Sequence, residues 1–375
     1  MSDPESAGRP LGGWSRRRAL AGAGAALIGV AAPAVAARAA GLSRLQLAGQ
    51  RVIASYPGLT PPASLLASIS DGQVAGVIFF GENIASATQM ARVTAQLRRA
   101  QARSPVKVPL LLMTDQEGGL VRRLPGQPAL SEKQIGQSAH PATAAAAAGT
   151  GAGRNLAAAG LNVNLAPVLD VYYKTGNFDD QFQRSYSHNP VVVSECGRAF
   201  ISAQQKAGVA AAAKHFPGLG SATSNQDTDR GPVTLTVPLA TLRAADELPY
   251  RAAVSAGVKL VMVSWALYPA LDARRPAGLS PVVIQQELRG RNKFTGVTVT
   301  DALEAGALHA FGTTAQRAVA AASAGMDLIL CSARDASQGA TATAALASAL
   351  ARGQLNPAAF TAAVNRVTAL RAGLR

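Results

Sequence analysis

Short apolar runs recur along the chain and alternate with longer, alanine-rich segments whose apolar residues have helical spacing. A short apolar run between turn signals is typical of a strand buried on both faces. Longer segments with apolar positions three and four residues apart are typical of helices that cover such a sheet. The pattern predicts strands at 51–55, 74–80, 108–114, 161–167, 209–214, 258–264, 297–300 and 326–331. It predicts helices at 85–102, 142–159, 190–207, 239–256, 281–288 and 313–324, and one or two closing helices over 340–375.

This order of elements predicts a barrel. Strands that alternate with helices form a parallel sheet, and eight such units are the number that closes it. An open doubly wound sheet is the alternative, but no Gly-x-Gly-x-x-Gly turn follows the first strand. We therefore predict the α/β class, with a single (β/α)8 TIM barrel over residues 37–375.

The first 36 residues have the pattern of an export signal. The segment 15–18, Ser-Arg-Arg-Arg, precedes a mildly apolar stretch at 21–35, and Ala34-Val35-Ala36 offers a small-residue cleavage site. Paired arginines before such a stretch resemble a twin-arginine signal, and an ordinary secretory signal is the alternative. We predict that residues 1–36 direct the protein to the cell envelope or the medium.

Charge and cysteine content narrow the classes of partner. The formal net charge is +15, which favours contact with an anionic surface such as a cell-wall polymer. The basic residues are mostly scattered singly and form no nucleic-acid motif, so we expect no nucleic acid partner. The two cysteines, Cys196 and Cys331, leave a disulfide open, and the Cys and His residues have no metal-ligand spacing. We therefore predict neither a metal nor a cofactor.

Polar side chains follow most of the predicted strands. A parallel barrel gathers the carboxyl ends of its strands into one pocket, so residues far apart in the sequence meet there. A charged group directly after a buried run is costly unless it has a partner or water. We therefore expect one site from the residues in these positions, which are Asn83, Asp115, Asp170, Lys214, His215, Ser264, Trp265 and Asp301.

Three motifs among these positions carry a family resemblance. Lys214-His215-Phe216-Pro217-Gly218-Leu219-Gly220 is followed by Asp227-Thr228-Asp229. The second motif is Asp115-Gln116-Glu117-Gly118-Gly119-Leu120-Val121-Arg122-Arg123, and the third is Asp301-Ala302-Leu303 after the seventh strand. Together they resemble the motifs of family 3 glycoside hydrolases, in particular the single-domain bacterial β-N-acetylhexosaminidases.

The resemblance implies a retaining glycosidase. In it Asp301 would be the nucleophile that forms a covalent glycosyl-enzyme, and helix capping is the alternative for this residue. The sugar would be bound by Asp115, Arg123, Arg184, Lys214 and His215. Asp170 would support the site by pairing with Arg184 or Lys214.

The sequence departs from the family pattern where the family carries its general acid/base. The family has His at the position of Asp229, and His again at the position of Leu219. A carboxylic acid protonates a leaving group if burial or a second carboxylate raises its pKa, and Asp227 lies two residues before Asp229. The sequence leaves open whether Asp229, Asp227 or another group is the acid.

Further alternatives concern single residues and the activity itself. One hypothesis is that Trp265 stacks on a sugar face. Another is that Glu117 forms a structural ion pair with Arg122 or Arg123. The main prediction is removal of terminal N-acetylglucosamine from peptidoglycan or chitin-type fragments. A family 3 enzyme with another sugar specificity and a non-catalytic glycan-binding barrel are the alternatives, and the oligomeric state is not predicted.

Overall fold

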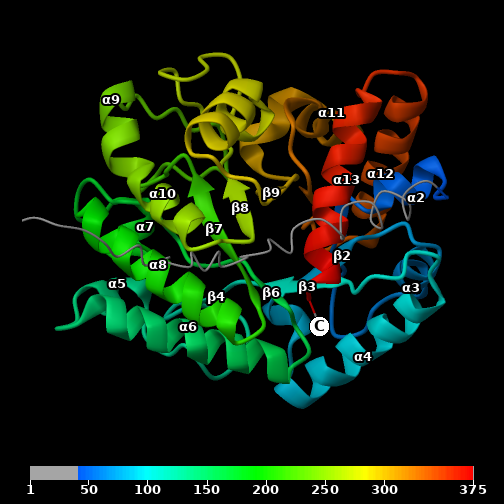
Figure 1. The fold of residues 1–375 in the computed structure, drawn as a ribbon, viewed down its shortest axis with the longest axis horizontal. Helices are drawn as coiled ribbons and strands as arrows, with labels where there is room; N and C mark the ends of the chain where they lie inside the picture. The colour runs from blue at the N-terminus through cyan, green and yellow to red at the C-terminus, as the bar shows by residue number, and fades with distance from the viewer. Residues whose placement is uncertain (1–40, 375) are drawn as a thin grey trace, which may run out of the picture.

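The computed structural model describes residues 41–374, which form one barrel with helices around it (Figure 1). The predicted export signal, residues 1–36, lies outside the described residues. Among the described residues, no helix is both long and apolar enough to cross a membrane.

Eight parallel strands form the sheet, in the order β10-β1-β2-β3-β6-β7-β8-β9. An isolated parallel bridge between Val299 of β9 and Leu328, next to β10, joins the two ends of this order. The (β/α)8 prediction is confirmed, with each observed strand within or overlapping its predicted run. The strands are β1 (Val52–Ala54), β2 (Gly76–Phe79), β3 (Leu111–Thr114), β6 (Val163–Asn164), β7 (Ala210–Phe216), β8 (Leu260–Val263), β9 (Val297–Thr300) and β10 (Ile329–Leu330).

Helices cover the outside of the barrel, as the alternation predicted (Figure 1). The principal ones are α2 (Arg44–Gly49), α3 (Ala63–Ser70), α4 (Ala87–Arg103), α6 (Pro141–Ala158), α8 (Pro190–Lys206), α10 (Leu248–Ser255), α11 (Thr314–Ala324), α12 (Ala336–Ala351) and α13 (Pro357–Ala372). Shorter pieces include α5 (Glu132–Gly136), α7 (Phe178–Gln181), α9 (Leu239–Thr241), two π-helical segments (Leu242–Asp246 and Val282–Arg291) and a 3-10 helix (Gly306–Phe311). One hairpin, β4 (Gln116–Gly118) with β5 (Val121–Arg122), was not predicted.

Glycine sets the distance between two of the outer helices, α6 and α8. At Gly149 of α6, an added Cβ would lie 2.3 Å from the carbonyl oxygen of Phe200 in α8. The backbones of α6 and α8 therefore approach more closely than any side chain would allow. This contact explains why position 149 carries glycine.

The barrel is apolar inside and closed by charges at the amino-terminal ends of its strands. Side chains such as Ile53, Met113 and Met262 form a buried cluster within it. Asp327, at the start of the last strand segment, is fully buried and forms ion pairs with Arg289 (2.6 Å) and Arg366 (2.7 Å). These polar groups at the amino-terminal ends of the strands stabilise the fold. Active sites of such barrels form at the opposite end, at the carboxyl ends of the strands.

The two cysteines are separate core residues. Cys196 lies in α8 and Cys331 directly follows β10. Both are buried and carry free thiols. The disulfide that the sequence left open is not formed.

Candidate active site

A pocket opens at the carboxyl ends of the strands. The side chains predicted to bind or react with substrate come from β7 and from the loops that follow β3, β6, β7 and β9. All eight line this pocket, together with Glu117, Leu219 and Thr228: Asp115, Arg123, Arg184, Lys214, His215, Asp227, Asp229 and Asp301. The structure thus brings together residues that span 187 positions of the sequence, from 115 to 301.

Lys214 is held among carboxylates at the end of β7. It is 2 % exposed, and its Nζ lies 2.7 Å from Asp115 Oδ1 and 2.7 Å from Glu117 Oε1. Burial lowers the pKa of Lys214, but the two carboxylates outweigh it and raise the pKa above its ordinary value. Lys214 is therefore a fixed cation that closes one side of the pocket.

Glu117 joins Lys214 to Arg184. Its two oxygens accept from Arg184 Nε and Nη2, both at 2.9 Å, in a bidentate pair. Burial raises the pKa of Glu117, but Arg184 and Lys214 outweigh it and lower the pKa to about 2. The prediction that Glu117 pairs with Arg122 or Arg123 is wrong, because β4 turns its side chain inward and Arg122 is exposed.

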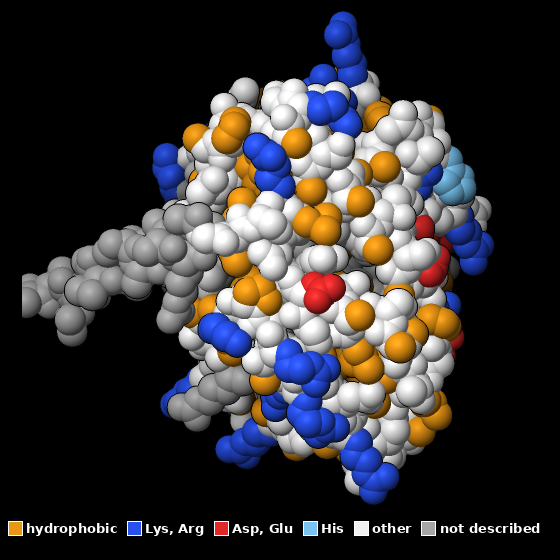
Figure 2. Space-filling model, turned by 90° about the vertical axis from the view of Figure 1, so that its right-hand side faces the viewer, with side chains coloured by type: hydrophobic (Ala, Val, Ile, Leu, Met, Phe, Trp, Pro, Cys, Tyr) orange, Lys and Arg blue, Asp and Glu red, His pale blue; other side chains and the backbone are white. Residues whose placement is uncertain are grey.

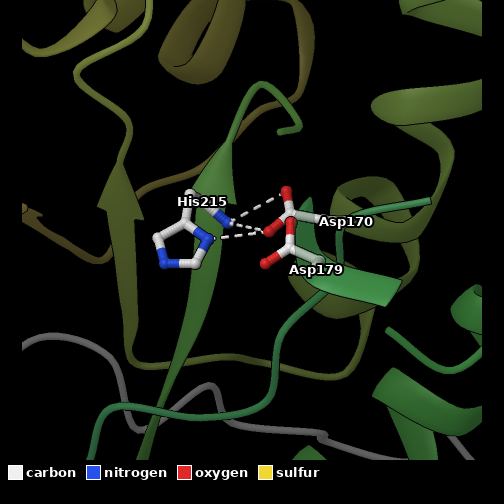
Figure 3. A group of neighbouring side chains, drawn as sticks. All are labelled: Asp170, Asp179 and His215. Carbon is white, nitrogen blue, oxygen red and sulfur yellow. Dashed lines mark hydrogen bonds and ion pairs between the residues drawn. The ribbon is translucent and has the colours of Figure 1, made fainter. Parts of the chain in front are cut away.

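His215 lies next to Lys214 and is oriented by Asp170 (Figure 3). Its Nδ1 is 2.7 Å from Asp170 Oδ2, and the backbone N–H of Leu219 donates to Asp170 Oδ1 at 2.6 Å. Burial is the largest of the effects that lower the pKa of His215 to about 4, so this contact is a hydrogen bond from a neutral ring. Asp170 supports the site as predicted, but its partner is His215 rather than Arg184 or Lys214.

Asp301 follows β9 directly and is partly exposed to the pocket. Its Oδ1 accepts the backbone N–H of Ala302 at 2.8 Å. Burial and the charge of Asp229 raise its pKa, while the Ala302 N–H and the charge of Lys214 oppose that rise. The strand end therefore fixes a carboxylate in the lining of the pocket.

Asp227 and Asp229 lie on the loop after β7. Asp227 Oδ1 accepts the backbone N–H of Asp229 at 2.9 Å. Asp229 is at the exposed rim, where partial desolvation and then the charge of Asp227 raise its pKa. The backbone carbonyls of Thr228 and Asp229 accept from Ala307 (3.0 Å) and Gly306 (2.8 Å), which holds the loop against the 3-10 helix.

Asp229 also lines a second cavity outside the pocket. This outer cavity has a volume of about 360 Å³ and shares Phe80, Arg123 and Asp229 with the pocket. Glu304 and Arg334 line the outer cavity but not the pocket. Asp229 therefore stands at the boundary between an inner and an outer binding space.

Three strand-end residues singled out by the sequence have structural roles. Trp265 is 1 % exposed and its Nε1–H donates to the carbonyl of Ala302 at 2.8 Å, so the prediction that it stacks on a sugar is wrong. Asn83 is fully buried and its amide bonds the backbone of Tyr56. Ser264 Oγ accepts the N–H of Ala266.

One residue of the site was missed. Asp179, in the short helix α7, is 1 % exposed and lies beside Asp170 and His215 (Figure 3). The sequence offers one signal, a pair of acids at 179–180 only four residues before Arg184. That signal does not show which of the two acids faces the site.

The pocket at the strand ends of this closed parallel barrel presents carboxylates, a lysine and an arginine, which can accept from and donate to the hydroxyl groups of a ligand. Residues 46–370 match the model of the glycosyl hydrolase family 3 N-terminal domain, and the chain belongs to glycoside hydrolase family 3. It is a glycosidase of this family.

Relatives and solved structures agree with this assignment. A protein of Arthroderma benhamiae described as a secreted glycosyl hydrolase is 45 % identical over 93 % of this chain and 98 % of its own length. A β-hexosaminidase of Xanthomonas euvesicatoria is 37 % identical over 68 % of this chain and 76 % of its own.

Among solved structures, a β-N-acetylhexosaminidase of Beutenbergia cavernae superposes with a TM-score of 0.79 and 34 % identity, over 88 % of this chain and 98 % of that one. A family 3 β-N-acetylglucosaminidase of Paenibacillus has a TM-score of 0.83 and 35 % identity, over 88 % of this chain and 62 % of that one. The present chain thus spans less than two thirds of the Paenibacillus protein.

The Glu117 ion pairs generate a prediction about stability. Glu117→Gln leaves Lys214 and Arg184 with one carboxylate fewer, so we expect a loss of about 3–5 kcal/mol in the free energy of unfolding near neutral pH. The pKa of Glu117 is about 2 in the folded protein against an ordinary 4.5. Its ionisation therefore stabilises the fold above pH 4.5, and this contribution is lost as the pH falls toward 2. Urea unfolding at pH 7 and pH 3 measures both effects.

The matched control for this prediction is Glu82→Gln, which breaks an exposed pair with Arg334 at 3.4 Å. We expect a change of less than about 1 kcal/mol from it. If the free energy of unfolding of the wild type exceeded that of Glu117→Gln by the same amount at pH 3 and at pH 7, the ionic role of Glu117 would be contradicted.

Proposed function

We propose that the protein is an exported, retaining β-N-acetylhexosaminidase that removes terminal β-linked N-acetylglucosamine from peptidoglycan or chitin-type fragments. The proposal rests above all on the position of two carboxylates. Asp301 lines the pocket at the end of β9, and Asp229 lines both the pocket and the outer cavity. The names of the Xanthomonas, Beutenbergia and Paenibacillus relatives support this sugar.

Asp301 would be the nucleophile. The carboxylate is fixed by β9 and by the Ala302 N–H, and no salt bridge to it occurs among the described residues. It is therefore free to attack the anomeric carbon and form a glycosyl ester. The charge of Lys214 favours its ionised form.

The sugar would be held by the groups around Lys214. Asp115 accepts from hydroxyl groups, while Lys214, Arg184 and Arg123 donate to sugar oxygens. His215 is neutral and its Nδ1 is used by Asp170, so its Nε2 is available to accept a hydroxyl proton. These groups line one side of the pocket and would set the orientation of the ring.

Asp229 would be the general acid/base. Its raised pKa favours the protonated form, which gives its proton to the glycosidic oxygen as the bond to the leaving group breaks. Ionised Asp229 then takes a proton from water, the water oxygen bonds to the anomeric carbon, and Asp301 is released. Asp227 holds the backbone of Asp229 in place.

Paired variants test these roles on aryl β-N-acetylglucosaminides. Asp301→Ala should lose at least about 10³-fold in kcat with every leaving group, because the covalent step is removed. Asp229→Ala should lose about 10²–10⁴-fold with poor leaving groups and far less with dinitrophenolate, which needs little protonation. Proton NMR of the first product should show the β-anomer.

Each contrary result has a definite meaning. Wild-type turnover of other aryl glycosides but not of this one would overturn the sugar specificity. Sugar binding without turnover of any aryl glycoside would show a glycan-binding barrel. Equal losses in Asp229→Ala for all leaving groups would exclude Asp229 as the acid.

The loop that carries Asp227 and Asp229, here called the acid loop, packs against Gly306, and this contact gives a second prediction. A Cβ added at Gly306 would lie 2.4 Å from the backbone of Arg230, next to Asp229. Gly306→Ala should therefore displace the loop and reduce kcat/KM for poor leaving groups by about tenfold or more, since a small misplacement of the acid is sufficient. Gly231→Ala is the matched control, because its Cβ would meet nothing within 4 Å. Equal kinetics for the two variants would contradict this role of Gly306.

We propose that the exported protein also contacts an anionic cell-wall polymer through α4. The Arthroderma relative, 45 % identical, is described as secreted. Residues 84–114 carry four Arg and one Lys and no acidic residue. Figure 2 looks at the side of the molecule that carries α3 and α4, and it shows many basic and few acidic side chains.

The spacing on α4 favours a linear partner. Arg92, Arg99 and Arg103 are seven and four residues apart, so they form one stripe about 16 Å long. All three are exposed, and none forms a salt bridge within the described part of the chain. A polymer with regularly spaced phosphates would follow such a stripe.

Cosedimentation with purified teichoic acid tests the stripe. The triple variant Arg92→Gln, Arg99→Gln, Arg103→Gln should bind at least about tenfold more weakly at low salt, and wild-type binding should fall as salt rises. The control changes Arg154, Arg198 and Arg352, which are exposed on other elements, to Gln. A similar loss of teichoic acid binding in both triple variants would show an effect of net charge alone and would overturn the proposal that the α4 stripe binds the polymer.

A further inference from the structure

Asp179 has a buried oxygen that nothing in the structure satisfies. The side chain is inaccessible, and its Oδ2 has no hydrogen-bond partner. Its other oxygen, Oδ1, is 3.5 Å from Arg184 Nη1, at the limit of a hydrogen bond. A buried polar atom without a partner costs about 1–3 kcal/mol, so its presence beside the pocket needs a physical cause.

The Asp179 carboxylate points toward Asp170 and His215 (Figure 3). One oxygen from each carboxylate and one nitrogen of the ring lie within 4.8 Å of one another. Two carboxylates so close do not both ionise readily in a buried place. Either a proton or a cation must compensate for one of the charges.

The hydrogen bonds assign the negative charge to Asp170. Its oxygens accept from the backbone N–H groups of His215 (3.3 Å) and Leu219 (2.6 Å) and from Nδ1 of the His215 ring (2.7 Å). Asp179 has only the long contact with Arg184. Donors stabilise an ionised carboxylate, so the proton belongs on Asp179.

A metal ion fits this cluster less well. Asp170 already accepts three N–H donors, and Nδ1 of His215 would have to lose its proton to become a ligand. The guanidinium of Arg184 also lies against Asp179. A proton satisfies Oδ2 without disturbing any of these contacts.

We infer that Asp179 is a positioning residue whose protonated carboxyl donates to Asp170, so that Asp170 keeps His215 in the tautomer whose Nε2 accepts from substrate. The effect of Asp179 on the reaction rests on the proposed function, whereas its effect on the His215 ring does not. Asp179 acts through Asp170 and His215, and it does not line the pocket itself.

The surrounding charges agree with a proton on Asp179. Burial, followed by the charge of Asp170, raises its pKa to about 7, while Asp170, also raised chiefly by burial, has a pKa of about 6. The other charged or titratable groups that face Asp179 are Arg184, which lowers its pKa, Glu117, which raises it, the neutral ring of His215, and the buried phenols of Tyr250 and Tyr268.

The decisive experiment compares Asp179→Asn with Asp179→Ala. An asparagine amide can still donate to Asp170, whereas alanine cannot. We expect Asp179→Ala to raise KM by about tenfold or more with a smaller change in kcat, and Asp179→Asn to recover most of that loss. Wild-type KM should rise as the pH passes above 7, where the pair loses its proton, and Asp179→Asn should lack this rise.

A sugar-free readout separates this proposal from the proposed function. Nitrogen NMR of labelled histidine, with His215→Gln to assign the signal, reports the tautomer of the ring. In wild type and Asp179→Asn we expect Nδ1 to carry the proton at pH 6.5, and in Asp179→Ala we expect a mixture of tautomers. This result is independent of whether any glycoside is cleaved.

Asp180→Asn is the matched control, because Asp180 is the next residue of α7 and pairs with Lys133 at 2.6 Å instead. It should leave the pH dependence of KM and the His215 tautomer unchanged.

Three results would overturn the proposal. The first is an equal rise in KM for Asp179→Asn and Asp179→Ala, which would show that Asp179 acts as a negative charge paired with Arg184. The second is an unchanged tautomer in Asp179→Ala. The third is Zn²⁺ raising the melting temperature of wild type but not of Asp179→Asn, which would show a cation in the cluster.

Discussion

The burial of Lys214 is the constraint on which the rest of the site depends. β7 is a run of alanines that ends in a lysine only 2 % exposed. A buried ammonium is stable only with close counter-charges, and here Asp115 and Glu117 provide them at 2.7 Å each. Glu117 in turn requires Arg184, which comes from a loop after α7. One buried cation therefore fixes the relative positions of β7, the β4 hairpin and that loop.

The same chain of contacts extends to the other side of the pocket. Arg184 reaches Asp179, and Asp179 lies beside Asp170, which orients His215. His215 precedes the segment that leads to the acid loop, and the acid loop is seated on the backbone of Gly306, a few residues beyond Asp301. The electrostatic groups and the two carboxylates proposed to react are thus parts of one connected arrangement. This connection explains how a site assembled from distant segments keeps its geometry.

Several features could be predicted from the sequence because they depend on local pattern. The apolar runs placed all eight strands, because a buried parallel strand needs continuous apolar residues. The residues after those runs identified Asp115, Lys214, His215 and Asp301, because the barrel topology gathers strand ends. Trp265 followed the same rule and was nevertheless assigned wrongly. Its ring packs against Gly278 and its N–H finds the Ala302 carbonyl, and neither contact has a signal near Trp265 in the sequence.

The sequence by itself determined the eight-unit barrel, the family resemblance and the eight predicted substrate-binding and reacting residues that line the pocket. The tertiary structure decided which of these residues pair. It assigned Glu117 to Lys214 and Arg184, joined Asp170 to His215, and brought Asp179 into the site from a helix of four residues. The physical reason is that periodicity and strand ends are encoded over a few neighbouring positions, whereas ion pairs and shared protons depend on distances between segments that meet only after the barrel closes.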